Sequence, residues 1–141
     1  NNAKVWSLDH LVRAARHEWI VMADSDIRAE ADLLGKLAGE FAADERLGVA
    51  TCPYRAVGGP SLWSELEALG MNTEFLAGVL VARMLEGMRF TLGPTVAARK
   101  AAIEAVGGWG AFRDYLAEDF VLGQRVSEAG WHSILSRAVV E

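Results

Sequence analysis

Apolar residues recur along the first third of this chain with two alternating patterns. Residues 4–15 carry them at helical spacing, with Asp9 and Arg13 outside the apolar stripe, which predicts an amphipathic helix. Residues 19–23 are five consecutive apolar residues, which indicates a buried strand. A second helix is expected around 33–41 and a second strand over 47–54, stopped near Pro53. Helix and strand in alternation are typical of an α/β layered fold.

The middle of the chain is its most apolar part. After the break at 58–60, residues 61–85 predict one or two helices, with Leu62, Leu66 and Leu69 on one stripe. Two interpretations are open for this stretch. The simpler one is a helix packed in the core, and the other is a helix that meets a lipid surface or an apolar substrate.

The last third returns to shorter elements. Residues 89–99 predict a strand with a kink at Gly93-Pro94, and residues 100–106 predict a short helix closed by Gly107-Gly108. A final helix is expected over 119–129, ended by Gly130, followed by a strand over 134–140.

Composition narrows the classes of protein that fit. With 141 residues, 52% of them hydrophobic, one domain or part of one is expected. The formal net charge of −5, without a basic run, argues against a nucleic-acid partner. The single Cys52 excludes an internal disulfide, and the three histidines lack zinc-ligand spacing. The longest uncharged apolar stretch, 75–82, is shorter than a membrane span requires, so a soluble or peripheral segment is expected.

The first candidate for chemistry is the pair Asp24 and Asp26 at the end of the first predicted strand. In an extended chain, residues i and i+2 point to the same side, so the two carboxylates are expected to converge on one ligand. Mg²⁺ or Mn²⁺ fits such a pair, because these ions take oxygen ligands and leave positions open for phosphate. The alternative is structural, since Asp and Ser are common in turns and helix caps.

The second candidate is the pair Glu118 and Asp119 at the start of the last predicted helix. There the helix macrodipole stabilises negative charge, so an ordinary acidic helix start is one interpretation. The other is a general base that takes a proton from an attacking hydroxyl.

These acidic pairs belong to a longer pattern that resembles the ceramide glucosyltransferase family, glycosyltransferase family 21, and its bacterial lipid- and hopanoid-associated relatives. The resemblance covers nearly the whole chain. It rests on five segments in order: Asn2-Ala3-Lys4-Val5, residues 23–28 with Asp24-Ser25-Asp26, residues 51–55, Tyr115-Leu116-Ala117-Glu118-Asp119-Phe120, and Ala129-Gly130-Trp131.

The resemblance implies a GT-A-type fold, an α/β architecture with a mixed sheet flanked by helices. It implies inverting transfer of a glucose- or N-acetylglucosamine-type sugar from a UDP-sugar to a lipid hydroxyl such as that of ceramide or a hopanoid. Asp24 and Asp26 match the motif that holds the donor diphosphate through Mn²⁺ or Mg²⁺, and Lys4 lies in the donor-side segment. Asp119 matches the proposed base, with Glu118 beside it. Residues 90–99 correspond to the wall between donor and acceptor sites.

Two family motifs lie outside this sequence: an aspartate expected before Asn1, and a Gln/Arg-x-x-Arg-Trp motif expected after Glu141. Residues 1–141 are therefore expected to be the central and C-terminal part of one catalytic domain. The resemblance implies a protein at the cytoplasmic face of a membrane, in bacteria the inner membrane, which it reaches through parts outside this segment.

Two other classes of protein share some of these features. A haloacid-dehalogenase-type phosphotransferase also places Asp-x-Asp after an apolar strand and would use Asp24 as nucleophile. However, Ile27-Arg28 follows the pair where that class has a small flexible residue. The other alternative is a non-catalytic lipid- or partner-binding module on a transferase-like fold.

Overall fold

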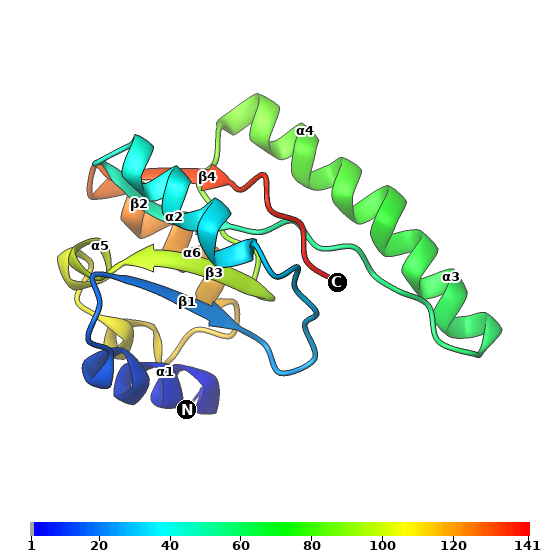
Figure 1. Ribbon diagram of the computed structural model, residues 1–141, viewed down its shortest axis with the longest axis horizontal. Coiled ribbons are helices and arrows are strands. Elements are labelled where there is room, and N and C mark those ends of the chain that lie inside the picture. Colours follow the sequence, from blue (N-terminus) through cyan, green and yellow to red (C-terminus); the bar gives the residue numbers. More distant parts are fainter. Residues whose placement is uncertain (1) are drawn as a thin grey trace.

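A computed structural model describes residues 2–141 and contains one four-stranded mixed sheet, in the order β1-β3-β2-β4 (Figure 1). The strands are β1 (Trp19–Ala23), β2 (Leu47–Thr51), β3 (Thr95–Arg99) and β4 (His132–Leu135). Both β1 and β2 run antiparallel to β3, whereas β4 runs parallel to β2. The predicted α/β class is confirmed.

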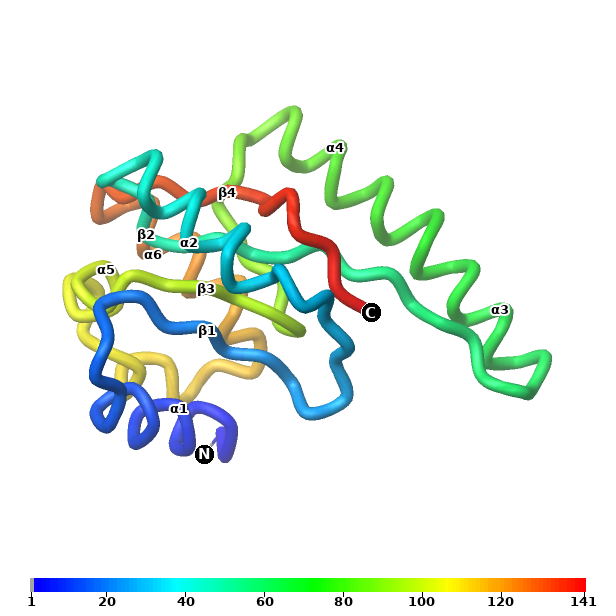
Figure 2. The backbone as a smooth tube through the Cα atoms, viewed as in Figure 1, coloured from blue at the N-terminus to red at the C-terminus, as the bar shows by residue number. Residues whose placement is uncertain are grey.

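Helices cover both faces of this sheet. One face packs against α1 (Ala3–Ala14), α5 (Lys100–Ala105), the 3₁₀ turn η2 (Trp109–Phe112) and α6 (Glu118–Glu128). The other face packs against α2 (Leu33–Ala43) and the C-terminal segment. Successive strand residues point to opposite faces, so Val49 and Ala98 enter the first core while Ala50 and Ala97 enter the second. Figure 2 shows the C-terminal segment beside the loop after β1, where the Glu141 N–H donates to the Arg28 carbonyl at 2.8 Å.

The third part of the fold is a continuous helical rod that projects beyond the sheet (Figure 1). It consists of α3 (Leu62–Gly70), the π-helical turn η1 (Met71–Phe75) and α4 (Leu76–Glu86), and is called the helical arm below. Ser61 caps its start by accepting a hydrogen bond from the Ser64 N–H, and Gly87, with φ of 73°, ends it. The Asn72 side chain ties the middle of the arm to both backbone groups of Ala56, each at 2.9 Å.

The strand predicted over 89–99 is wrong in its first half, since β3 begins only at Thr95. The backbone of Leu92 pairs instead with the buried side chain of Thr51, and Pro94 has no N–H to donate to a neighbouring strand.

The strand predicted over 134–140 is also shifted. β4 covers His132–Leu135, and Val140 returns only as an isolated bridge to Tyr54. Between them, the Ala138 N–H donates to the Ser136 hydroxyl and turns the chain. The second predicted strand similarly ends at Thr51 rather than at Tyr54.

The core interpretation of the 61–85 stretch is wrong for most of its large side chains. Leu62 is 66% exposed, Trp63 79% and Met84 78%. Among the arm's residues only Ala68 and Val79 are buried hydrophobics. The helical spacing of the apolar residues matches the structure, but this spacing does not indicate which face of the helix packs against the protein.

Candidate active site

Lys4 on α1 joins the two acidic pairs that the sequence singled out. Its Nζ lies 2.9 Å from the Asp24 Oδ1 at the end of β1 and 3.8 Å from the Glu118 Oε1 at the start of α6. It also lies 3.5 Å from the Gly93 carbonyl oxygen, to which it donates. Residues from three other, distant parts of the chain therefore converge on the Lys4 ammonium group.

Asn2 fixes α1, and with it Lys4, against α6. The Asn2 Oδ1 caps α1 by accepting hydrogen bonds from the Lys4 and Val5 N–H groups. Its Nδ2 donates to the Glu118 Oε2 at 3.0 Å and to the Tyr115 carbonyl at 3.1 Å. The Glu118 carboxylate is buried, and its two oxygens face Asn2 and Lys4. Glu118 thus holds the start of α6 against Asn2 and Lys4 of the N-terminal helix.

The segment 90–94 is held from several sides. The Thr91 hydroxyl donates to the Asp119 carbonyl at 2.6 Å, and the Pro94 carbonyl accepts from the Asp24 N–H at 2.9 Å. The Leu92 backbone is paired with the Thr51 hydroxyl on β2. A Cβ added to Gly123 would lie 2.4 Å from the Phe90 backbone, so α6 packs directly on this segment. The segment thus links β1, β2 and α6 at the site.

Gly93 allows the Asp119 carboxylate to approach this segment. A Cβ at Gly93 would lie 2.8 Å from the Asp119 Oδ2 and 3.8 Å from the Lys4 Nζ, so a side chain there would displace the carboxylate. The other oxygen, Oδ1, accepts a hydrogen bond from the Phe120 N–H at 2.8 Å. Asp119 lies in the first turn of α6, where the positive end of the helix dipole stabilises a carboxylate.

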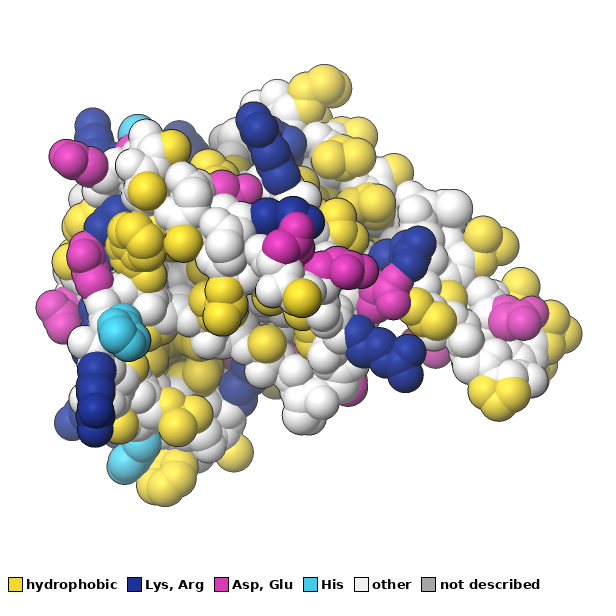
Figure 3. All heavy atoms as spheres, in the orientation of Figure 1, with side chains coloured by type: hydrophobic (Ala, Val, Ile, Leu, Met, Phe, Trp, Pro, Cys, Tyr) yellow, Lys and Arg dark blue, Asp and Glu magenta, His cyan; other side chains and the backbone are white. Residues whose placement is uncertain are grey.

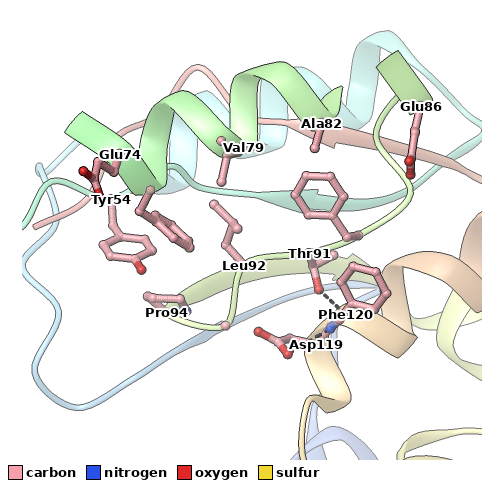
Figure 4. A pocket seen from close by; sticks show the side chains of 14 residues that line it. Tyr54, Glu74, Val79, Ala82, Glu86, Thr91, Leu92, Pro94, Asp119 and Phe120 are labelled. Atoms are coloured by element: carbon pink, nitrogen blue, oxygen red, sulfur yellow. Dashed lines mark hydrogen bonds between the residues drawn. The ribbon is translucent and has the colours of Figure 1, made fainter. Parts of the chain in front are cut away.

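Two cavities meet at Gly93. One, of about 630 Å³, lies between α4 and the segment 90–94 and is closed at one end by Asp119 (Figure 4). Figure 4 shows Val79 of α4 and Leu92 pointing toward each other across it, and most of its other walls are apolar or aromatic. The other cavity, of about 740 Å³, lies between α1 and β1 and is lined at one end by Lys4, Asp24 and Ser25.

Tyr54 lies on the wall of the first cavity and packs against Phe75 of the arm, with ring centroids 5.4 Å apart. Burial raises the pKa of the Tyr54 phenol, and the negative charge of Asp119 raises it further. The phenol is therefore a neutral hydrogen-bonding group at physiological pH within the electrostatic reach of Asp119.

Asp26 lies outside this set of contacts. It is exposed in a turn in which the Ile27 N–H donates to the Asp24 carbonyl, so the extended geometry assumed for the Asp24–Asp26 pair does not hold. Within residues 2–141, no group of three His, Cys, Asp or Glu side chains is arranged to hold a metal ion.

The donor set nevertheless fits a Mg²⁺ or Mn²⁺ ion of the type bound with a nucleotide. Such an ion needs only one or two carboxylates, with phosphate and water oxygens completing its shell. Asp24 is partly exposed and already attracts the Lys4 cation, and Asp26 is two residues away on an open turn.

Several residues of the site were not predicted as functional. The role of Asn2 is visible only when its cap and its contact with Glu118 are seen together. Gly93 was read as a strand kink, although a Gly-Pro pair inside an apolar run is a usable signal for close backbone approach. Thr91 and Tyr54 lie within residues 90–99 and 51–55 of the family pattern, but nothing in the sequence indicates a role for either side chain.

Comparisons with known proteins match this architecture. The chain aligns with the mannosyltransferase PcManGT from Pyrobaculum calidifontis, solved in complex with GDP-Man and Mn²⁺, with a TM-score of 0.68 and 22% identity. The alignment covers 99% of this chain and 36% of that one. Cellulose synthase 2 of Novacetimonas hansenii is 25% identical over 142 residues, which cover 97% of this chain and 9% of that protein.

The fold is therefore the GT-A type found in nucleotide-sugar transferases, as predicted. A family model for glycosyl transferase family 21 matches residues 1–141, and the chain belongs to this family. The match confirms the resemblance described from the sequence and speaks against the haloacid-dehalogenase alternative. The chain spans well under half the length of each of these two relatives.

Proposed function

We propose that the full-length protein is an inverting glycosyltransferase that moves a sugar from a UDP-sugar to a lipid hydroxyl, with Asp119 as general base. The observation that carries this proposal is the arrangement around Gly93. On one side lies an apolar cavity that ends at the Asp119 carboxylate, and on the other lies the cavity with Lys4 and Asp24. An apolar acceptor and a charged donor would thus meet at one point.

The reaction is a single displacement. The acceptor hydroxyl oxygen attacks the anomeric carbon of the sugar, and the bond from that carbon to the diphosphate breaks with its electron pair leaving on the diphosphate. An alcohol is a weak nucleophile until it begins to lose its proton, which Asp119 would accept on its carboxylate.

Donor binding is assigned to Lys4, Asp24 and Asp26. A divalent ion held by Asp24 and Asp26 would neutralise charge that develops on the leaving diphosphate. The Lys4 ammonium is placed to contribute a further positive charge on the same side. The GDP-Man and Mn²⁺ bound to PcManGT support a nucleotide sugar and a divalent metal. The choice of UDP, and of a glucose- or N-acetylglucosamine-type sugar, follows from the family resemblance.

The lipid acceptor is supported by the apolar lining of the cavity beside Asp119. Phe90 and Phe120 stack at its wall with ring centroids 6.2 Å apart, and Val79, Ala82 and Leu92 add aliphatic surface. An alkyl chain bound there would gain about 0.8 kcal/mol for each buried methylene. An acceptor presented at the cytoplasmic face of a membrane, a ceramide or hopanoid for example, fits this site.

The test is Asp119→Asn in the full-length protein, assayed with UDP-sugars, Mn²⁺ and lipid acceptors. Removing the base is expected to lower kcat by about 10²–10⁴-fold, because that is the usual contribution of general base catalysis. Donor affinity by calorimetry should stay close to wild type, since Asp119 lies on the acceptor side of Gly93. Glu128→Gln, at the other end of α6, is the control carboxylate-to-amide change. Near-normal turnover would remove Asp119 from the mechanism.

Asp26→Ala tests the metal role without disturbing the Lys4–Asp24 ion pair. Because Asp26 is exposed in a turn, its removal should leave the fold intact. We expect Mn²⁺-dependent donor binding to weaken by at least about tenfold. Unchanged affinity would contradict the metal assignment. Vesicle binding that persists in a wild-type protein with no transferase activity would favour the non-catalytic module.

A further inference from the structure

One face of the helical arm packs against the protein, and the other face is exposed to solvent. Toward the protein it places the buried Ala68 and Val79 and the hydrogen-bonded Asn72. Away from the protein it places rows of large exposed apolar side chains. These are Leu62, Trp63, Leu66 and Leu69 on α3, and Leu80, Val81, Met84 and Leu85 on α4. Figure 3 shows hydrophobic side chains gathered along the outer edge of the arm.

The spacing of the outward residues gives one helical row on α3 and one on α4 rather than scattered exposure. Leu62, Leu66 and Leu69 lie at i, i+4 and i+7, and Leu80 and Met84 lie at i and i+4. On α3 the acidic Glu65 and Glu67 flank the apolar row on its two sides. A contiguous apolar face bordered by polar residues marks an interaction surface.

By length and composition, the helix Leu62–Glu86 is apolar enough to cross a membrane, with mean hydropathy 1.3 over its most apolar 18 residues and 11% of them buried. The way in which this helix is connected to the rest of the chain argues against a transmembrane orientation. The chain enters the arm from β2 and returns from it to β3, and the Asn72–Ala56 hydrogen bonds hold its middle to the same body. A helix whose middle is hydrogen-bonded to the segment that follows β2, and whose two ends both lead back to the same sheet, can lie on a bilayer but is not arranged to pass through it.

We propose that the helical arm lies on the surface of a lipid bilayer, with its outward apolar row inserted at the boundary between headgroups and acyl chains. An interfacial helix buries such side chains by about 5–10 Å. The arm carries four acidic residues and one basic residue, Glu65, Glu67, Glu74, Glu86 and Arg83. Attraction to anionic headgroups therefore does not drive the contact, and neutral phosphatidylcholine is a sufficient partner.

The same helix connects this surface to the site. While Leu80 and Met84 face outward, Phe75, Val79 and Ala82 of the same segment line the cavity that ends at Asp119. A bilayer on the outer face would place lipid beside the opening of that cavity. This last step rests on the proposed function, whereas the docking of the arm does not.

The experiment measures insertion depth in the full-length protein. A fluorophore is attached at Leu62→Cys or Met84→Cys, and the matched control is Leu34→Cys on α2, because Leu34 is 64% exposed and Leu62 is 66% exposed. Cys52 is buried and does not compete for the label. The protein is mixed with or reconstituted into phosphatidylcholine vesicles that carry a nitroxide on the acyl chain.

We expect nitroxide quenching to be several-fold stronger at positions 62 and 84 than at position 34, and insensitive to salt. Equal quenching at all three positions would overturn the proposal. Labels at 62 and 84 that are shielded from an aqueous quencher without being quenched by lipid would also overturn it, since protein, for example a second copy of this chain, would then cover the arm. Since no readout depends on turnover, an inactive protein with inserted labels would separate failure of the proposed function from failure of this proposal.

Discussion

The centre of the sheet and the helical arm have similar apolar content but opposite surroundings. Every residue of β2 and β3 is buried, because helices cover both faces of the sheet. The arm has one neighbour, the body beneath it, and leaves its outer face open. Hydrophobic free energy comes from surface removed from water, at about 25 cal/mol per Å². The sheet therefore stabilises the fold, while the outer face of the arm keeps its apolar surface available for a partner.

The two regions should differ most in how much a Leu→Ala substitution lowers the free energy of unfolding. Leu122 of α6 is fully buried against the sheet, so Leu122→Ala removes its packing and leaves a cavity, at a cost of about 3–5 kcal/mol in free energy of unfolding. Leu69 of the arm is 59% exposed, and Leu69→Ala is expected to cost less than about 0.5 kcal/mol in solution. Urea denaturation of the two variants checks this. Similar losses would mean that the arm is packed in solution.

Two glycines provide a smaller test of the same contrast. Gly123→Ala would place a Cβ 2.4 Å from the Phe90 backbone, so α6 must move away from the segment that holds the site, at a cost of about 1–3 kcal/mol. Gly78→Ala in α4 meets nothing within 4 Å and should stabilise the helix by about 0.5–1 kcal/mol. Thermal unfolding of both variants shows directly whether each substitution raises or lowers the stability. A stabilising Gly123→Ala would show that α6 is not held tightly against residues 90–91.

Local signals in the sequence were sufficient for much of the fold. The helix predicted over 4–15 is α1, and the strand predicted at 19–23 is β1 at the same bounds. The last helix was placed within one residue, since Gly130, with φ of 86°, fixes its end. In each case the residues that define the element also carry its start or stop signal.

The parts of the fold and of the site that the sequence did not predict depend on contacts between residues far apart in the chain. Nothing near Leu92 in the sequence shows that its backbone pairs with a side chain 41 positions away, so the strand before Thr95 was predicted wrongly. For a related reason, the sequence left open whether the arm is packed in the core or exposed, because a helical period does not say which face another layer covers. At the site, the residue pattern alone singled out Asp24, Glu118 and Asp119, and the family resemblance added their roles and Lys4. The convergence of Asp24 and Glu118 on Lys4 required the fold.

The smallest effect is expected at an exposed contact of the sheet body, where Asp44 after α2 meets His132 at the start of β4. The Asp44 Oδ2 lies 2.6 Å from the His132 Nδ1, and this hydrogen bond is the main cause that lowers the pKa of Asp44 below its ordinary value of 3.8. Because the folded state holds the carboxylate ionised, the contact stabilises the fold above about pH 4 and is lost as the pH falls through the lowered pKa of Asp44.

The Asp44→Asn variant tests this contact, since its side chain can still accept a hydrogen bond from the Arg46 N–H but should lose this acid dependence of stability. Urea midpoints at pH 6 and pH 3 should therefore differ slightly less for Asp44→Asn than for wild type, with Asp32→Asn at the start of α2 as the control. An unchanged difference would mean that the Asp44–His132 contact does not form in solution, and that this end of β4 is held by its other contacts, among them its pairing with β2.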